Sequence, residues 1–365
     1  MTMILDGHKL YWHRERVEAW MAGERVAPIT IDCALTRRCN YRCSYCYGKL
    51  QENERRNISW RSIARFLDDA AEIGVKAVSF VSDGESTLHP DLNRAILHGR
   101  RNGLDMALGT NGLLFDPDPD VLASLTYLRF NFSAADPRRY AEIHGVKADC
   151  FETVCRRIEQ AVKVKRQSGL PITIGLQMVF MPAFADQVIP LARLGKQLGV
   201  DYTIFKHCSD DELHSLSVKY EDYAKHVPLL VEAESLSENG YEVRTKWSKI
   251  LSGSYRRYPR CYGPAFIMQF SGSGLVAPCG MLFNERFRDL FHIGNIAEGS
   301  FKNLWKSDRY WKVLNLIGSD EFDPQTMCGS LCLQHKVNEF LWDLKQGAAR
   351  LPQDPGPKPE HVNFI

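Results

Sequence analysis

The 365-residue sequence contains no long hydrophobic run and almost no excess of charge of either sign. A membrane-spanning helix needs about 20 consecutive apolar residues, so we expect no membrane-embedded segment. Lys and Arg number 46 and Asp and Glu 44, whereas a dedicated nucleic-acid binder usually has a basic excess. Residues 1–16 mix charged residues with short apolar pairs, unlike the apolar core of a secretory signal. These absences predict a cytoplasmic protein that binds neither membrane nor nucleic acid.

Cysteine, in contrast, is abundant. The chain has eleven cysteines, and an odd number cannot form a closed set of disulfides. In a reducing compartment, clustered thiols more often bind metal or perform redox chemistry. Two groups stand out, between residues 39 and 46 and between residues 261 and 332. Cys33, Cys150 and Cys155 lie outside both groups, and we expect them to be buried structural thiols.

The region from residue 29 to residue 206 alternates β-branched runs with amphipathic stretches, which predicts βα units around a parallel sheet. Six such units are too few for a closed eightfold barrel, which needs about 250 residues. We therefore expect an α/β fold with a partial, TIM-like (β/α)6 barrel. Ser59 and Gly74 are typical of the start and end of one of its helices. The strands are expected at residues 29–35, 77–81, 105–109, 127–132, 172–180 and 202–205.

The rest of the chain is expected to add smaller parts around this barrel. Residues 1–28 form an N-terminal extension, and residues 207–259 a helical linker. Glycines, short strands and four cysteines predict a small, separate Cys-rich α+β domain over residues 260–350. Residues 351–365 are rich in proline and have no periodicity, so we expect a tail.

The first cysteine group is Cys39, Cys43 and Cys46, with the spacing C-x3-C-x2-C directly after the first expected strand. Three thiolates so close in sequence can hold a 4Fe-4S cluster and leave its fourth iron without a protein ligand. A structural zinc site would need a fourth ligand, and the residues between the cysteines offer none. A zinc loop that borrows a distant His or Cys is the alternative.

This motif resembles that of the radical S-adenosylmethionine (SAM) superfamily, in which an aromatic residue precedes the last cysteine, as Tyr45 does here. The resemblance implies that SAM chelates the open iron and is cleaved by one electron to a 5′-deoxyadenosyl radical. It also implies an electron donor such as flavodoxin or ferredoxin. Residues 29–206 would then be the radical SAM barrel.

Further stretches fit this resemblance at the ends of expected strands. Asp83-Gly84-Glu85 resembles the Gly-Gly-Glu motif that holds the amino group of SAM, with Asp83 in place of the first Gly. The Thr-Asn-Gly turn with Asn111 resembles another common family segment. The remaining cofactor-binding candidates are Asn131, Ser133 and Gln177. Asn131 or Ser133 would contact the ribose of SAM, whereas Gln177 is either a barrel-facing ligand or a satisfied core glutamine.

The second cysteine group consists of Cys261, Cys279, Cys328 and Cys332. The pattern C-x12-G-x4-C over its first part looks like the opening of the SPASM and Twitch extensions, which carry auxiliary iron–sulfur clusters in radical SAM enzymes. Four thiolates imply one fully ligated auxiliary 4Fe-4S cluster. A four-cysteine zinc ribbon is the alternative, although its tight C-x2-C knuckles are absent.

Lys206, His207 and Cys208 end the last expected barrel strand. Lys206 and His207 are candidates for a base or a substrate clamp, and Cys208 for a hydrogen donor to a substrate radical. We expect a radical SAM oxidoreductase that dehydrogenates a small polar metabolite, of sugar, aminocyclitol or nucleoside type. An epimerase that uses Cys208, a peptide-modifying maturase and a non-catalytic zinc scaffold remain as alternatives. Only 38 residues precede Cys39, which is short for a peptide-recognition domain.

Overall fold

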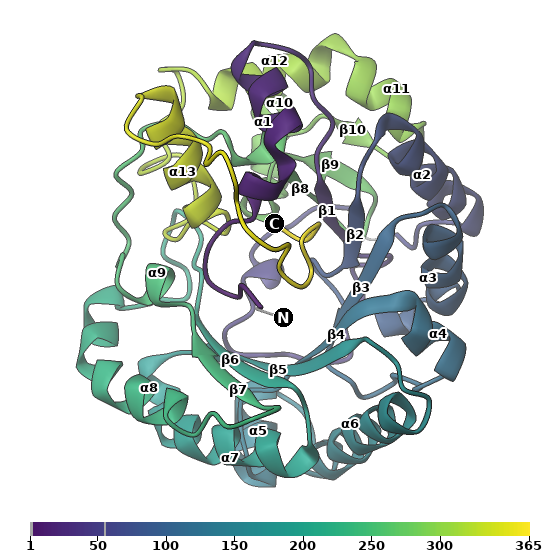
Figure 1. Ribbon diagram of the computed structural model, residues 1–365, viewed down its shortest axis with the longest axis vertical. Helices are drawn as coiled ribbons and strands as arrows, with labels where there is room; N and C mark the ends of the chain where they lie inside the picture. Colours follow the sequence, from purple (N-terminus) through teal and green to yellow (C-terminus); the bar gives the residue numbers. More distant parts are fainter. Residues whose placement is uncertain (1–2, 55) are drawn as a thin grey trace.

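The computed structural model describes residues 3–54 and 56–365. Its centre is a ten-stranded sheet in the order β10-β9-β8-β1-β2-β3-β4-β5-β6-β7, which curves into an open barrel (Figure 1). Strands β8 and β1 through β7 run parallel, and β9 and β10 add an antiparallel edge. The predicted fold class, a partial TIM-like barrel, is confirmed. The strands are β1 Thr30–Cys33, β2 Ala77–Phe80, β3 Asp105–Thr110, β4 Leu125–Asn131, β5 Thr173–Phe180, β6 Tyr202–His207, β7 Glu242–Thr245, β8 Ile267–Phe270, β9 Leu275–Ala277 and β10 Gly294–Asn295.

Helices cover the outside of the barrel (Figure 1). Ser59 accepts a hydrogen bond from the Ser62 amide at the start of α2, and Gly74 ends that helix with φ 94°, as predicted. Asp136 caps α5 in the same way. The helices are α1 Arg14–Met21, α2 Trp60–Ile73, α3 Leu92–Arg101, α4 Pro119–Ser124, α5 Pro137–His144, α6 Asp149–Gln167, α7 Val188–Leu198, α8 Val227–Glu234, α9 Trp247–Ile250, α10 Arg288–Phe291, α11 Phe301–Lys306, α12 Asp308–Ile317 and α13 His335–Lys345. None of the helices so described is long and apolar enough to span a membrane.

The segment 207–259 differs from the helical linker expected from the sequence. It contains β7, which pairs in parallel with β6 through Tyr202 and Glu242. The strand has only four residues, and Glu242 and Arg244 alternate with the buried Val243 and Thr245. So short an alternation gives almost no strand signal. The parallel sheet therefore continues one strand beyond the six that were predicted.

The C-terminal Cys-rich domain shares its sheet with the barrel. Strand β8 pairs in parallel with β1, with Thr30 opposite Ile267 and Cys33 opposite Phe270. The Cys-rich part thus extends the barrel sheet at its other edge. A pairing between strands more than 200 residues apart leaves no local sequence pattern, so sequence periodicity cannot predict it.

Residues 361–365, in the segment expected to be a tail, form the floor of the barrel. Phe364 packs against Tyr127, with ring centroids 4.9 Å apart. Thr30, the first residue of β1, donates a hydrogen bond to the Asn363 carbonyl at 2.6 Å, and Lys9 donates to the Phe364 carbonyl at 2.7 Å. The C-terminal end and the N-terminal segment from residue 3 to residue 9 accordingly lie in the middle of the ring of strands (Figure 1). The two terminal segments close the barrel at the amino-terminal ends of its strands.

Candidate functional site

A cavity of about 1010 Å³ occupies the inside of the barrel. Successive side chains of a strand point to opposite faces, and the cavity is lined by every second residue of the strands. The strand residues that face it include Thr30, Asp32, Gly109, Tyr127, Arg129, Asn131, Gln177, Val179, Tyr202, Ile204, Lys206, Ile267 and Gln269. The cavity therefore has polar side chains that are held in place by a rigid sheet. In such barrels the reactive groups lie at the carboxyl ends of the strands.

Cys39, Cys43 and Cys46 lie in the loop after β1, and all three line this cavity. The Tyr41 amide donates to the Cys39 sulfur at 3.4 Å, and Nδ1 of His144 lies 3.3 Å from the Cys43 sulfur. Burial raises the pKa of Cys39 to about 11 and that of Cys43 to about 12. Such thiols stay protonated unless a metal displaces the proton. Three thiols on one cavity wall fit a cluster that keeps one iron open toward the cavity.

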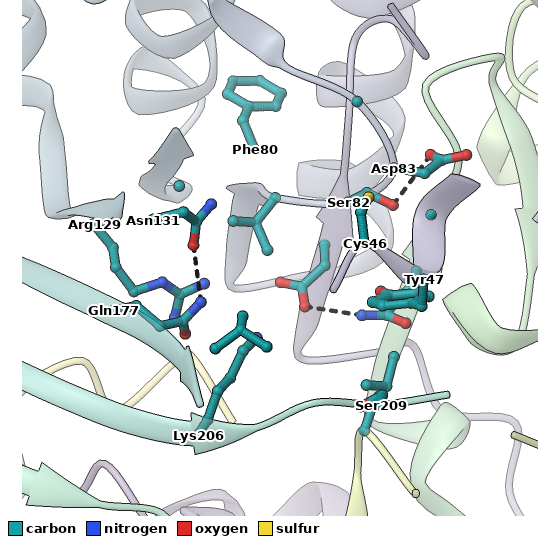
Figure 2. A pocket seen from close by; sticks show the side chains of 18 of the residues that line it. Cys46, Tyr47, Phe80, Ser82, Asp83, Arg129, Asn131, Gln177, Lys206 and Ser209 are labelled. Atoms are coloured by element: carbon teal, nitrogen blue, oxygen red, sulfur yellow. Dashed lines mark hydrogen bonds between the residues drawn. The ribbon is translucent and has the colours of Figure 1, made fainter. Parts of the chain in front are cut away.

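Tyr45 and Ser133 form a buried support behind this loop. The Ser133 hydroxyl donates to the Tyr45 hydroxyl at 3.3 Å, and the Ser133 amide donates to Nε2 of His144 at 3.0 Å. Ser133 is fully buried and is not among the residues that line the cavity. Of the two residues proposed for the ribose, only Asn131 reaches the cavity, where it accepts a hydrogen bond from Gln177 at 2.9 Å (Figure 2).

The loops after β2 and β3 are joined through Glu85. One oxygen of its carboxylate accepts from the Thr110 hydroxyl and the other from the Asn111 amide, both at 2.7 Å. Gly84 has φ 125°, and a Cβ there would lie 2.1 Å from the Thr36 carbonyl. Only glycine fits at that position. Gly84, Glu85 and Asn111 therefore lie together at one rim of the cavity.

Asp83, which takes the place of the first glycine of the motif, is buried and fully bonded. It accepts from the Arg37 guanidinium at 2.9 Å, from the Ser271 hydroxyl at 2.7 Å and from the Gly272 amide at 2.8 Å. Ser271 and Gly272 belong to the turn between β8 and β9. Asp83 at this position thus joins the loop after β2 to the turn between β8 and β9.

Lys206 and His207 both line the cavity, whereas Cys208 does not. The Cys208 thiol is buried and donates to the Tyr45 carbonyl at 3.5 Å. The His207 ring packs against Tyr220 and Tyr223, and neither of its nitrogens has a hydrogen-bond partner among the described residues. Burial, with the nearby Arg129 charge as the next cause, lowers the pKa of Lys206 well below its usual value.

The polar cavity residues that the sequence did not indicate include Asp32, Arg129, Lys246 and Gln269. Burial raises the pKa of Asp32 to about 6, against the opposing effect of the Arg129 charge. Gln269 donates to Asp32 at 3.4 Å. A single charged residue inside an otherwise apolar strand, as in Ile31-Asp32-Cys33, was the available signal.

Cys261, Cys279, Cys328 and Cys332 come together around one small pocket beside the cavity. The Asn338 amide donates to the Cys332 sulfur at 3.4 Å and to the Cys261 sulfur at 3.6 Å. Burial raises the pKa of Cys328 to about 11. The remaining lining is largely apolar, so the four thiols fit a second, fully ligated cluster shielded from water.

The spacing of the thiols also bears on the identity of the metal. In a tetrahedral zinc site with bonds of about 2.3 Å, the sulfurs lie roughly 3.8 Å apart. No three His, Cys, Asp or Glu side chains in residues 3–54 and 56–365 are gathered closely enough to bind one ion. Each cysteine of a four-iron cluster binds a different iron, which permits a wider spacing.

Two family models match the chain, and each one covers one of the two cysteine groups. Residues 34–190 match the radical SAM superfamily, and residues 261–332 match the SPASM iron–sulfur cluster-binding domain. The chain is a radical SAM protein with a SPASM domain. Membership implies SAM and a 4Fe-4S cluster at the first site and auxiliary iron–sulfur chemistry at the second, in place of either zinc alternative.

Relatives of this radical SAM protein have varied activities. It is 22% identical to a tungsten-containing aldehyde ferredoxin oxidoreductase cofactor-modifying protein of Pyrococcus furiosus, over 76% of this chain and 80% of that protein. It is 28% identical to a GTP 3′,8-cyclase of Aquifex aeolicus, over 76% of this chain and 89% of that one. The crystal structure of Streptococcus suis SuiB bound to S-adenosylmethionine has the same fold, with a TM-score of 0.62, 16% identity, and coverage of 98% of this chain and 82% of SuiB.

Proposed function

We propose that this radical SAM protein dehydrogenates a small polar metabolite, of sugar, aminocyclitol or nucleoside type, inside the barrel cavity. One observation carries the proposal: a chain of contacts joins the cavity to the auxiliary site. The amide of Gln269 donates to Asp32 in the cavity at 3.4 Å, and its oxygen accepts at 2.6 Å from the backbone amide of Gly280, the residue after Cys279. Dehydrogenation removes two electrons from the substrate. An auxiliary cluster next to the substrate cavity would accept the second of these electrons.

Cys39, Cys43 and Cys46 would hold the first cluster, and the four cysteines of the SPASM region the second. Gly84, Glu85, Asn111 and Asn131 would bind SAM. Tyr45 and Ser133 would support the cysteine loop from behind. When bound, SAM and the clusters supply a radical that removes a hydrogen atom and an acceptor for one electron. A ferredoxin or flavodoxin would deliver the starting electron.

The remaining task is the removal of a proton from a substrate hydroxyl or amine, and we assign it to Asp32. Its carboxylate faces the cavity, and its raised pKa of about 6 makes it a better proton acceptor than an ordinary aspartate. Lys206 also faces the cavity and would clamp the substrate. His207 lines the cavity as well, and its ring nitrogens have no bonded partner within the described residues, so they are available to a polar group of the substrate.

The size of the cavity favours a small substrate over a peptide. Pockets for a single drug-sized molecule usually measure about 300–1,000 Å³, and this cavity of about 1010 Å³ has to hold SAM as well. The floor formed by Phe364 and Lys9 also blocks passage through the barrel. The space that remains suits one metabolite.

Epimerisation would use the same machinery with a thiol as the hydrogen donor. Cys208 was the candidate for that role, and its thiol is buried against the Tyr45 carbonyl, outside the cavity lining. That placement supports dehydrogenation. Under our proposal, Cys208→Ala keeps turnover, whereas an epimerase that depends on this thiol would lose it.

Anaerobic reconstitution and turnover test the proposal. The wild type should bind about eight irons per chain and form 5′-deoxyadenosine from SAM and dithionite, whereas Cys43→Ala should form none. With a panel of sugars, aminocyclitols and nucleosides, the true substrate should yield a product lighter by two hydrogens. A deuterium on the reacting carbon should appear in 5′-deoxyadenosine. An isomer of unchanged mass as the product would refute dehydrogenation.

A further inference from the structure

We propose that the substrate bears a carboxylate or a phosphate, which binds to Arg129, Lys206 and Lys246 inside the barrel. This inference rests on the proposed function, because it takes the cavity as the substrate site. It narrows the substrate from a polar metabolite to an anionic one.

Three neighbouring strands bring these basic side chains to one wall of the cavity. Arg129 on β4 and Lys206 on β6 point into the same space, on either side of Gln177 on β5 (Figure 2). Lys246 follows the last residue of β7 and lines the same cavity. The strands are adjacent in the sheet, so three basic groups converge from positions fixed by its register.

None of the three has an acidic partner within residues 3–54 and 56–365: the ion pairs and side-chain hydrogen bonds found there do not include them. The Nε atom of Arg129 is buried and has no hydrogen-bond partner in the part of the chain that the structure describes. Other lysines of the cavity differ, because Lys9 donates to two carbonyls and Lys249 donates to the Leu333 carbonyl. The three basic groups are thus available to a ligand.

The acids that line the cavity cannot balance this charge. Asp83 is paired with Arg37, and both oxygens of Glu85 accept hydrogen bonds from its neighbours. Glu52 is exposed to solvent. Asp32 interacts with Arg129 and Lys206, and Asp6, which is bonded to Ser248, interacts with Lys246, so two carboxylates face three basic groups. Burial of charged groups without partners is strongly unfavourable. A ligand anion would supply the missing negative charge.

The chemistry of the three side chains indicates what they bind. A guanidinium matches the planar fork of a carboxylate or the edge of a phosphate through two parallel hydrogen bonds, and an ammonium adds a compact charge. Arg129 precedes Asn131 by two residues on β4, so it lies about 7 Å deeper in the barrel. An anionic group anchored there would direct the rest of the substrate up toward the cysteine loop.

Anaerobic calorimetry on the reconstituted holoenzyme with SAM bound tests this site. The probes are inorganic phosphate and malonate, and their relative affinities distinguish a phosphate from a carboxylate site. We expect one of them to bind with a dissociation constant of about 1 mM or below. Arg129→Gln, Lys206→Met and Lys246→Met should each weaken it about tenfold or more. Arg129→Lys should restore part of the affinity, and Lys163→Met, on the exposed face of α6, is the matched control.

Three results would overturn the proposal. The first is that neither probe binds to the wild type, and the second is that Lys206→Met binds it as tightly as the wild type does. The third is that each substitution weakens the binding of SAM as much as it weakens the binding of the probe. The basic groups would then bind the carboxylate of SAM and not the substrate. Circular dichroism and cluster absorbance confirm that each variant is folded. Binding does not depend on turnover, so a protein that binds the probe yet forms no dehydrogenated product refutes the proposed function alone.

Discussion

Asp83 accepts a hydrogen bond from the guanidinium of Arg37 at 2.9 Å. Both side chains are almost completely buried, since 3% of Asp83 and 9% of Arg37 is exposed to solvent. Arg37 also donates to the carbonyls of Gln51 and Asn53, and Asp83 accepts from the Ser271 hydroxyl. The pair therefore joins the cysteine-containing segment after β1, the loop after β2 and the turn between β8 and β9 at one point.

Replacement of Asp83 by alanine should destabilise the protein by about 3–5 kcal/mol, because it leaves the Arg37 charge buried and unpaired. The melting temperature of the reconstituted protein should fall by about 5 °C or more. Glu238→Gln is the control: it breaks the exposed pair with Lys196, which should change stability by less than about 1 kcal/mol. Equal effects of the two substitutions would contradict the fastening role.

The ionisation of Asp32 should make stability depend on pH. Its pKa is about 6 in the folded chain, against an ordinary value of 3.8, so the folded state holds the proton more tightly between these values. The stability of the wild type relative to Asp32→Asn should therefore fall as pH rises from about 4 to about 6, by up to about 3 kcal/mol. Melting temperatures of both proteins from pH 5 to pH 8 measure the upper part of this change. Asp116→Asn, at an exposed aspartate, is the matched control, and an equal change in that variant would contradict a specific effect of Asp32.

Arg256 should raise the reduction potential of the auxiliary cluster. It is 5% exposed, donates to the Gly329 carbonyl, and lies close enough to Cys328 and Cys332 to interact with their charges. Removal of a nearby positive charge favours the oxidised cluster, so Arg256→Gln should lower the potential by about 50–100 mV. A redox titration followed by electron paramagnetic resonance measures it. Arg257→Gln, at a half-exposed neighbour with surface partners, should leave the potential nearly unchanged, and a shift of the same size there would rule out a specific effect.

Phe364→Ala should open the floor of the barrel. Phe364 is 7% exposed and packs on Tyr127, Ala77 and Ala107, so its truncation should cost about 3 kcal/mol. Hydrogen exchange should accelerate at the amino-terminal ends of the barrel strands. Tyr255→Ala is the matched control, because Tyr255 is 70% exposed and should contribute less than about 0.5 kcal/mol. Unchanged exchange in Phe364→Ala would show that the floor does not depend on this side chain.

The barrel itself could be predicted from the sequence because its signals are local. Ser59 and Gly74 mark the ends of α2 correctly, and all six predicted strands are present. The other elements depend on partners far along the chain. Strand β7 is stable because it lies against β6, and β8 because it lies against β1, so neither could be recognised from its own residues.

In the candidate site, too, some residues could be predicted from the sequence and others could not. Cys39, Cys43 and Cys46 form a compact motif, the four later cysteines follow a recognisable spacing, and the structure places each group around one space. Single residues were harder to predict, since Ser133 and Cys208 lie near the site without facing the cavity. Arg129 and Lys246 belong to no motif, and their importance comes from the closure of the sheet around them.

The floor of the barrel has a consequence for the order of assembly. Residues 361–365 are synthesised after every other part of the cavity wall, and they bond to Thr30 and Lys9 near the start of the chain. A nascent chain that has reached Cys332 already contains all seven cysteines of the two sites, while its barrel is still open below. Residues 361–365 therefore close the amino-terminal side of the barrel only after both cysteine groups have been synthesised.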